Sequence, residues 1–481
     1  MILKKSMMLV VVGLCLCLSA WTDTGSVLFL YTSDMHDYIK PGPDNLGGIP
    51  YVAGYVASIR KTRDDVLLLD GGDVMEKGDM VSYATQSRIM YEAMAKIGYD
   101  AGAVGNHDLT YGMDHLKECS ALAGMAHLCL NYSDENGNPY FPASKVFDKK
   151  GTRVGVIGLT NLKGGRYLDL PECGKRLAAE AARLKAEGAH LVVVVAHIGA
   201  GELEELSVLA PDVDILLGGH THDVLREPRI VPGTGALIIM VGQYARYVQY
   251  LDVTVDLEKK HIAITDARLV EMAHGEIDPD QELLAWIEAE EVKRCPEAVE
   301  VVGKSDKVIL ANDMARIAAE ALKWFAKADV AFCHPGQIMR SSLPAGDINT
   351  NLLFRTGGQR GSELVSIGLT GAQIEAYLGG LLQERKGQTE WAGFEGKMAY
   401  DREAKTWRLN GTLDPEKSYK VVMPRMEWDT RFQRVAEENP LLKDVAEPTK
   451  LDFDFTRAMS EYVKQITAQG KTLDAYLESL D

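Results

Sequence analysis

The sequence contains few cysteines and no Cys-x-x-Cys pair, which argues against a zinc ribbon and against a dithiol redox site. Two of the seven, Cys15 and Cys17, lie in an N-terminal segment that we expect to be removed. The odd number that remains leaves at least one free thiol. Cys119 and Cys129 have two open interpretations, a disulfide or two small buried side chains. The remaining cysteines are Cys119, Cys129, Cys173, Cys295 and Cys333.

The chain also has fewer basic than acidic residues: 52 Lys and Arg residues and 69 Asp and Glu residues give a formal net charge of −17. Such a chain repels polyanions, so we expect neither a nucleic acid polymer nor an acidic membrane surface as a partner. A small anionic substrate remains compatible with this charge, since metal ions can reverse the local sign at one site. At about 150 residues per domain, the 481 residues predict two to three domains.

Long apolar runs are absent except near the N-terminus. Lys4 and Lys5 precede the run Met7–Leu18, and small and polar residues follow it, which is the order of a secretory signal. The run is too short for a comfortable transmembrane span. We therefore expect a signal peptide at residues 1–20, whose loss takes the charge from −17 to −19, and a periplasmic or exported protein with cell-surface association open. An uncleaved N-terminal anchor is the alternative, and no other stable membrane insertion is expected.

Short, continuous apolar runs alternate with amphipathic stretches over residues 26–275. Such runs are typical of strands buried on both faces, and the alternation of strands and helices predicts a layered α/β domain. The stretch Ser87–Ile97 has apolar side chains at helical spacing and is followed by Gly98, which favours a helix end. The predicted strands are Val27–Tyr31, Val66–Leu69, Ala101–Val104, Val154–Leu159, Leu191–Val195 and Ile215–Leu217.

The pattern changes after this domain. Residues 276–300 are charged and helix-prone, so we expect a linker helix there. Residues 301–481 mix helices with strand-like apolar runs such as Tyr419–Met423, which predicts a second domain of the α+β class. The first helix of this domain is expected to be capped by Asn312 or Asp313.

Side chains that can bind metals follow five of the six predicted strands, just past their C-terminal ends. In α/β sheets that edge is where ligands bind, and neighbouring glycines permit the tight turns that bring such groups together. One of these groups alone is weak evidence, since Asn and Asp are common in turns. All five in order, each after a strand, predict a metal centre. The residues are Asp34, His36, Asp73, Asn106, His107, His197, His220 and His222.

The donor types narrow the choice of metal. Imidazole together with carboxylate oxygen suits zinc, manganese or iron rather than calcium. A bridging carboxylate holds two cations about 3.5–4 Å apart, which clamps the attacking and leaving oxygens of a phosphoryl transfer. Two divalent ions with Asp34 and Asp73 leave the site at about +2, which attracts a phosphate into an acidic protein. We therefore expect two divalent metal ions as cofactors and a small anionic phosphate ester as the substrate.

These motifs resemble those of the calcineurin-like metallophosphoesterases and, more closely, those of the exported bacterial 5′-nucleotidase / UDP-sugar hydrolase family. The similarity extends over nearly the whole mature chain. It implies an α/β protein with an N-terminal four-layer αββα metallophosphoesterase domain, a linker helix and a C-terminal α+β domain that supplies substrate specificity. The motifs are Asp34-x-His36, Gly72-Asp73, Gly105-Asn106-His107, His197, Gly219-His220-x-His222 and Leu130-Asn131.

The resemblance also assigns the ligands of two metals. The family often has Gln where this chain has His222; both residues bind metals, and the exchange bears on metal preference. One metal would be held by Asp34, His36, Asp73 and His222, and the other by Asp73, Asn106, His197 and His220, with Asp73 bridging the two.

His107 corresponds to the family's catalytic histidine, which would stabilise the transition state or protonate the leaving group beside the ligands Asn106 and Asp73. The family places an aspartate partner three residues after this histidine, where the present chain has Thr110. Asp108 is adjacent in sequence but is expected to point elsewhere on a turn. The partner of His107 is therefore open between Asp108 and another residue.

The similarity is looser in the C-terminal domain. The segment from Asp329 to Arg340 resembles the one that ends in the family's substrate-binding arginine. Arg355 and Arg360 are further candidate contacts for an anion, with ordinary surface arginines as the alternative.

In the family, two aromatic side chains enclose the nucleobase. Phe394 is the candidate for such a contact here, together with Trp391 and Trp428, for each of which core packing is the alternative. The family's Gly-Gly-Asp-Gly-Tyr-like loop is absent, and Glu427-Trp428-Asp429 stands in its place. Stacking is worth about 1–3 kcal/mol per base, so losing one partner is enough to change the substrate.

Together these features predict an exported dinuclear-metal phosphoester hydrolase that releases phosphate from 5′-nucleotides or related small phosphate esters by attack of a metal-bound hydroxide. One alternative keeps the site and changes the ester to a 2′,3′-cyclic nucleotide, a nucleotide sugar or a thiosulfohydrolase-like substrate. Another is a non-catalytic metal-binding or sensing protein that retains the fold. The full ligand set argues against the latter, since a pure binder has little physical need for it. The sequence does not indicate an oligomeric state.

Overall fold

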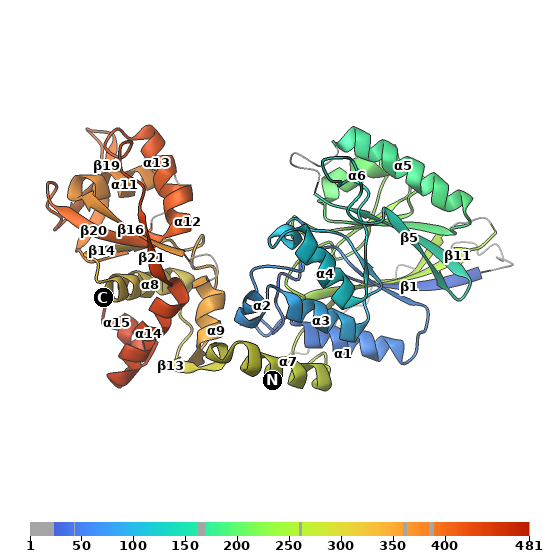
Figure 1. Cartoon of the computed structure of the whole chain (residues 1–481), viewed down its shortest axis with the longest axis horizontal. Coiled ribbons are helices and arrows are strands. Elements are labelled where there is room, and N and C mark those ends of the chain that lie inside the picture. The colour runs from blue at the N-terminus through green and yellow to red at the C-terminus, as the bar shows by residue number, and fades with distance from the viewer. Residues whose placement is uncertain are drawn as a thin grey trace, which may run out of the picture.

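The computed structural model describes residues 24–42, 44–161, 169–258, 262–358, 363–383 and 389–480. The predicted signal peptide at residues 1–20 and the candidate Arg360 lie outside these ranges. The described residues form an N-terminal and a C-terminal domain with a helix between them (Figure 1). None of the helices within these ranges has both the length and the apolar character needed to cross a membrane.

The N-terminal domain contains two six-stranded mixed sheets. The first has the order β12 (Ile262–Glu271), β11 (Tyr247–Asp256), β1 (Thr24–Thr32), β2 (Val66–Asp70), β3 (Ala101–Gly102) and β4 (Ala126–His127). The second has the order β5 (Ser144–Lys149), β6 (Thr152–Leu159), β7 (Leu191–Ala196), β8 (Ile215–Gly218), β10 (Leu237–Met240) and β9 (Arg229–Ile230). The strands β1, β2 and β3 run parallel, as do β6, β7 and β8, so their C-terminal ends share an edge.

Helices cover the outer face of each sheet (Figure 1). The inner faces pack against each other through buried side chains such as Phe29, Leu67 and Val193. This arrangement confirms the predicted four-layer αββα domain. The first sheet is covered by α1 (Ile49–Arg60), α3 (Arg88–Ile97) and α4 (Met113–Ala123), with the short α2 (Met80–Ala84) beside them. The second is covered by α5 (Leu170–Ala186) and α6 (Ala200–Leu209).

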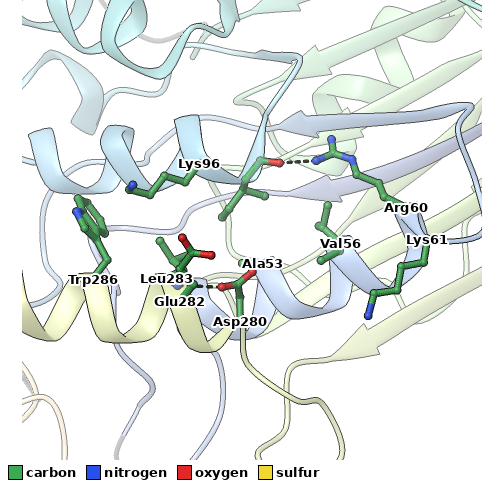
Figure 2. Close-up of a pocket in the computed structure, with 11 residues that line it drawn as sticks. Ala53, Val56, Arg60, Lys61, Lys96, Asp280, Glu282, Leu283 and Trp286 are labelled. Carbon is green, nitrogen blue, oxygen red and sulfur yellow. Dashed lines mark hydrogen bonds between the residues drawn. The ribbon is translucent and has the colours of Figure 1, made fainter.

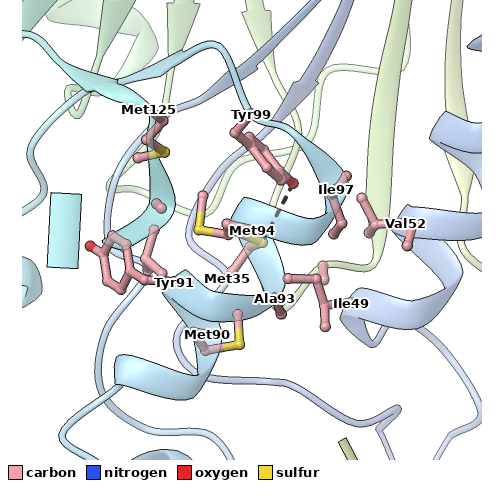
Figure 3. Close-up of a cluster of buried hydrophobic side chains, with 14 of the residues drawn as sticks. Met35, Ile49, Val52, Met90, Tyr91, Ala93, Met94, Ile97, Tyr99 and Met125 are labelled. Atoms are coloured by element: carbon pink, nitrogen blue, oxygen red, sulfur yellow. Dashed lines mark hydrogen bonds between the residues drawn. The ribbon is translucent and has the colours of Figure 1, made fainter. Parts of the chain in front are cut away.

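Several methionines lie in the core between the first sheet and its helices. Met90 and Met94 of α3 are buried with Met35 and Met125 in one cluster (Figure 3). Unbranched thioether side chains suit a space of irregular shape. Because Met35 lies between Asp34 and His36 in the chain, its burial anchors the loop that carries two candidate metal ligands.

The predicted helix at Ser87–Ile97 corresponds to α3, whose apolar side chains are buried, and Gly98 ends it with a φ of 78°. The strand predicted at Ala101–Val104 is shorter, because the chain leaves the sheet after Gly102 to form the loop that carries Asn106 and His107. Cys119 and Cys129 are both free and buried, which excludes the disulfide interpretation.

The predicted linker helix corresponds to α7 (Gln281–Arg294), which Asp280 caps by accepting a hydrogen bond of 2.9 Å from the Leu283 N–H. Leu283 and Ile287 are buried against the N-terminal domain. A cavity of about 690 Å³ lies between α7, α1 and the end of α3, with Lys96 above the Trp286 ring (Figure 2). The helix is therefore packed on the N-terminal domain along part of its length.

The C-terminal domain is built on a five-stranded mixed sheet with helices on both faces, in agreement with the predicted α+β class. The sheet has the order β17 (Glu390–Ala392), β14 (Val330–Cys333), β20 (Ser418–Pro424), β16 (Glu363–Thr370) and β21 (Thr449–Asp454). One face packs on α8 (Ala311–Ala326) and α14 (Phe455–Ala468), the other on α11 (Gly371–Gln383) and α13 (Gln433–Glu438). Smaller elements are β13 (Val301–Ser305) paired with β15 (Gly346–Asn349), β18 (Gly396–Asp401) paired with β19 (Thr406–Gly411), α9 (Thr350–Leu353), α12 (Arg425–Glu427) and α15 (Leu473–Glu478).

The start of α8 differs from the prediction. Its N-cap is Leu310, and the expected caps Asn312 and Asp313 lie inside the helix. A carboxylate in the first turn still interacts favourably with the helix dipole, which accounts for an acidic residue at Asp313 without a capping role.

The two domains contact each other through buried polar side chains. Asn351 donates a hydrogen bond of 2.7 Å to Asp79 and accepts one of 2.8 Å from the Met80 N–H. Arg355 donates to the Pro41 carbonyl at 2.6 Å and lies 3.3 Å from the Asp79 carboxylate. One buried carboxylate of the N-terminal domain therefore holds two side chains of the C-terminal domain.

Replacing Asn351 by Ala removes both of its hydrogen bonds in this contact. We expect the free energy of unfolding to fall by about 1–3 kcal/mol, because buried polar partners lose their hydrogen bonds. Urea denaturation measures the change. Asn410→Ala, which removes an exposed amide from β19, is the matched control and should change stability by less than about 0.5 kcal/mol. Equal effects of the two substitutions would contradict this account of the contact.

Candidate metal centre

The C-terminal ends of strands from both sheets meet at one edge of the N-terminal domain. Tyr31 at the end of β1 donates a hydrogen bond of 3.0 Å to the carbonyl of Gly218 in β8, which ties the sheets together at this edge. Two groups of possible metal ligands form there, and within each group the ligand atoms lie within 4.8 Å of one another. The first group is Asp34, His36 and His222, and the second is Asp73, His197 and His220.

In the first group, Asp34 and His36 are fully buried, whereas His222 is partly exposed. The Nε2 atoms of His36 and His222 are 3.1 Å apart, and the His222 Nε2 lies 3.2 Å from Asp34 Oδ1. Asp34 is fully buried. Burial favours a raised pKa for Asp34, but its hydrogen bond with His222 and the charges of the nearby histidines lower that pKa below its ordinary value.

Asp73 lies within reach of both groups. Its Oδ2 is 3.0 Å from His197 Nε2 in the second group and 3.7 Å from His36 Nε2 in the first. Its Oδ1 accepts a hydrogen bond of 2.7 Å from the His107 N–H, which fixes the carboxylate between them. Asp73 therefore has the position that a bridging ligand requires.

The backbone orients the buried imidazoles toward the centre. The Nδ1 of His36 lies 3.2 Å from the Met75 carbonyl, and the Nδ1 of His197 lies 2.9 Å from the Gly71 carbonyl. A carbonyl partner at Nδ1 leaves Nε2 as the metal-binding atom. Burial also lowers the pKa of His36 to about 3, so this ring is neutral and carries a lone pair at physiological pH.

The candidate ligands share an uncommon backbone conformation. Five of them have positive φ angles, between 48° and 72°, although none is a glycine. Such conformations persist only where the surrounding structure holds them, and they concentrate at functional sites. The residues are Asp34, His36, Asp73, His220 and His222.

The chemistry of this donor set fits two divalent cations. Imidazole nitrogens and carboxylate oxygens face one another at 3–4 Å, as expected of atoms that share a cation. The Oδ1 of Asn106 is buried and has no hydrogen-bond partner among the described residues, which fits a ligand atom of the second metal. Nitrogen with carboxylate oxygen again favours zinc, manganese or iron.

The structure resolves which carboxylate contacts His107. Asp108 is fully buried, and its two oxygens accept hydrogen bonds from the N–H groups of Asp73, Val74, Met75 and Gly105. It therefore supports the loop rather than the imidazole. Glu76 contacts the Nδ1 of His107 instead, and this contact lowers the pKa of Glu76 below its ordinary value. Sequence reasoning missed Glu76, because a Glu three residues after a metal ligand carries no signal of its own.

Asn161 is a second polar residue that the sequence interpretation missed. Its Nδ2 lies 2.8 Å from the Nε2 of His220. It follows β6, the one predicted strand to which no metal-binding side chain was assigned. The same pattern, a polar side chain just past a buried strand, would have identified it.

Two tyrosines connect the metal centre with the C-terminal domain. Tyr38 and Tyr244 stack with centroids 4.0 Å apart, and the Tyr244 ring lies 5.9 Å from that of His36. The guanidinium of Arg355 lies 4.7 Å from the centroid of the Tyr38 ring. Tyr244 has a φ of 64° and its N–H donates to the Asp34 carbonyl at 2.8 Å, a placement that only the tertiary structure reveals.

The predicted substrate contacts are dispersed. Arg340 is exposed, whereas the side chain of Arg355 is only 7% exposed in the domain contact, so Arg355 is not an ordinary surface arginine. Phe394 stacks on Trp391 with ring centroids 5.4 Å apart. Trp428 is 1% exposed and stacks on Phe432 in the core, as the alternative interpretation of this residue proposed.

Known protein families match both domains. The calcineurin-like phosphoesterase family matches residues 27–224, and the 5′-nucleotidase C-terminal domain matches residues 301–478. A 5′-nucleotidase of Vibrio cholerae is 26% identical over 404 residues, which are 71% of this chain and 72% of that protein. Endonuclease YhcR of Bacillus subtilis is 25% identical over 345 residues, which are 64% of this chain and only 28% of the endonuclease.

Solved structures share the fold. The crystal structure of a 5′-nucleotidase precursor from Thermus thermophilus superposes with a TM-score of 0.67 at 21% identity, over 92% of this chain and 97% of that one. The two family matches follow one another along the chain and together cover most of the described residues. The chain therefore belongs to the 5′-nucleotidase family, with a calcineurin-like phosphoesterase domain followed by a 5′-nucleotidase C-terminal domain.

Proposed function

We propose that this metallophosphoesterase hydrolyses 5′-nucleotides or related small phosphate esters, releasing phosphate outside the cytoplasm. The observation that carries the proposal is the position of Asp73, whose carboxylate reaches both His/Asp groups while its loop also carries Glu76 beside His107. Two divalent cations, when bound, polarise the phosphoryl group and lower the pKa of a bound water.

The residues around the centre support an anionic substrate. Lys77 Nζ lies 3.2 Å from His36 Nε2, which adds a positive group beside the ligands. The His107 ring lies 5.1 Å from the His36 ring, at the edge of the first group. In this position His107 is suited to stabilise the transition state or to donate a proton to the leaving oxygen.

The C-terminal domain supports a second candidate, in which the same site acts on a different ester. Trp428 is buried where the family has a loop with a stacking aromatic, and Phe394 pairs with Trp391 rather than standing alone. A cyclic nucleotide, a nucleotide sugar or a sulfur-bound ester is compatible with weaker stacking of the nucleobase than the family's two aromatic side chains provide. The net charge of −17 opposes a polymeric nucleic acid, although one relative is named an endonuclease.

Replacing Asp73 by Ala removes the carboxylate that reaches both groups. We expect hydrolysis to fall by at least about 10³-fold, because the loss affects both cations and the electrostatic stabilisation they provide. Metal content, measured by mass spectrometry, should fall with it. Asp223→Ala removes an equal charge from an exposed position near His222 and should retain activity. Full turnover by the Asp73→Ala variant would refute the mechanism.

A substrate panel distinguishes the two candidates. We expect the metal-loaded protein to release phosphate from adenosine 5′-monophosphate faster than it cleaves a 2′,3′-cyclic nucleotide, a nucleotide sugar or a thiosulfonate ester, with no cleavage of single-stranded DNA or RNA. Phosphate release and chromatography measure the products. A preference for another ester would favour the second candidate, and full metal content without turnover of any substrate would favour a binding protein.

Export is tested by the N-terminus of the protein made in a Gram-negative host. We expect cleavage near residue 20, because the apolar run Met7–Leu18 follows two lysines and precedes small residues. N-terminal sequencing of the periplasmic fraction checks this. Full-length protein found only in the cytoplasm would contradict export.

A further inference from the structure

We propose that Glu76 is the positioning residue for His107, in place of the aspartate that Thr110 replaces in this chain. The inference rests on the proposed function, since it assigns a residue to the same reaction. The carboxylate comes from a different segment, because Glu76 lies in the loop of Asp73, whereas the family's aspartate follows the histidine in the chain.

The contact is local and specific. The Glu76 carboxylate contacts the Nδ1 of His107, with side chains 37% and 26% exposed, so neither group is buried away from a substrate. A carboxylate at Nδ1 accepts a hydrogen bond from the Nδ1–H group and selects the ring orientation in which Nε2 is free to face a bound ester. Thr110, in contrast, is exposed and directs no carboxylate toward the ring.

The loop that carries Glu76 is held in an uncommon conformation. Glu76 and Lys77 have φ angles of 68° and 88°, and neither is a glycine. The Glu76 N–H donates a hydrogen bond of 2.6 Å to Asp37, which is buried and also accepts one from Ser87. Residues in such conformations persist only where neighbours over-determine them, and they occur at functional sites.

The residues just before Glu76 are held by the carboxylate of Asp108. Asp108 accepts hydrogen bonds from the N–H groups of Asp73, Val74 and Met75, so the residue next to His107 fixes the loop that returns to His107. Asp108 therefore holds the backbone of residues 73–75 in place, and Glu76 of the same loop supplies the carboxylate that contacts His107. Asp73 belongs to the same loop, so the imidazole and the candidate bridging ligand are positioned by one structural unit.

The first experiment compares Glu76→Ala, Glu76→Gln and the control Glu227→Ala, an exposed glutamate distant in sequence from the loop. We expect Glu76→Ala to lower kcat about 10- to 100-fold with KM nearly unchanged, as for other groups that orient a functional side chain. Glu76→Gln should recover part of the loss, since its amide oxygen still accepts a hydrogen bond from the Nδ1–H group. Glu227→Ala should leave both constants unchanged.

The second experiment separates positioning from metal binding. Metal content of Glu76→Ala should equal that of the unmodified protein, and a His107→Asn/Glu76→Ala double variant should be no slower than His107→Asn alone. A fall in metal content, or losses that multiply, would overturn the proposal, because Glu76 would then act independently of His107.

A readout without turnover keeps this test distinct from that of the proposed function. In the metal-free protein, nitrogen-15 NMR should find the His107 proton on Nδ1 in the unmodified chain and a changed tautomer distribution in Glu76→Ala. An unchanged His107 signal would refute the inference whatever the activity. Absence of hydrolysis with this NMR change present would count against the proposed function alone.

Discussion

The burial of two carboxylates, Asp34 and Asp73, is the constraint on which the rest of the site depends. Each follows the C-terminal end of a strand and has almost no access to water. An isolated buried ion is strongly unfavourable. The protein compensates with facing imidazoles and with backbone N–H donors from His107 and His220. The two His/Asp groups are placed so that two divalent cations, when bound, would complete the compensation, in a protein whose overall charge is negative.

The strained loops follow from this requirement. To direct short side chains from two sheets toward one point, the chain adopts left-handed backbone angles at five candidate ligands. Those angles are maintained by packing below the site, where Met35 is buried between the first sheet and α3, and by hydrogen bonds such as that from Tyr244 N–H to the Asp34 carbonyl. The stable core and the strained site are therefore parts of one arrangement, in which packing energy opposes local strain.

The sequence predicted the substrate contacts of the C-terminal domain less well than the candidate metal ligands of the N-terminal domain. Its mixed sheet and helices follow the family, yet Trp428 is in the core and Arg355 is in the domain contact. Through Tyr38 and Tyr244, Arg355 lies two aromatic rings from the metal centre. The C-terminal domain is thus joined to the phosphoesterase domain beside the candidate metal centre.

The sequence by itself determined the layered α/β domain, the second α+β domain and the positions of the candidate metal ligands in the chain. These rest on local patterns, since a buried strand needs continuous apolar residues and the polar residues after it stand out. Only the tertiary structure decided that Asp108 supports a loop, that Glu76 contacts His107, that Asn161 reaches His220 and that Trp428 is buried. These contacts join residues that are far apart in the sequence, so no local pattern marks them. Their roles depend on the neighbours that the fold places beside them.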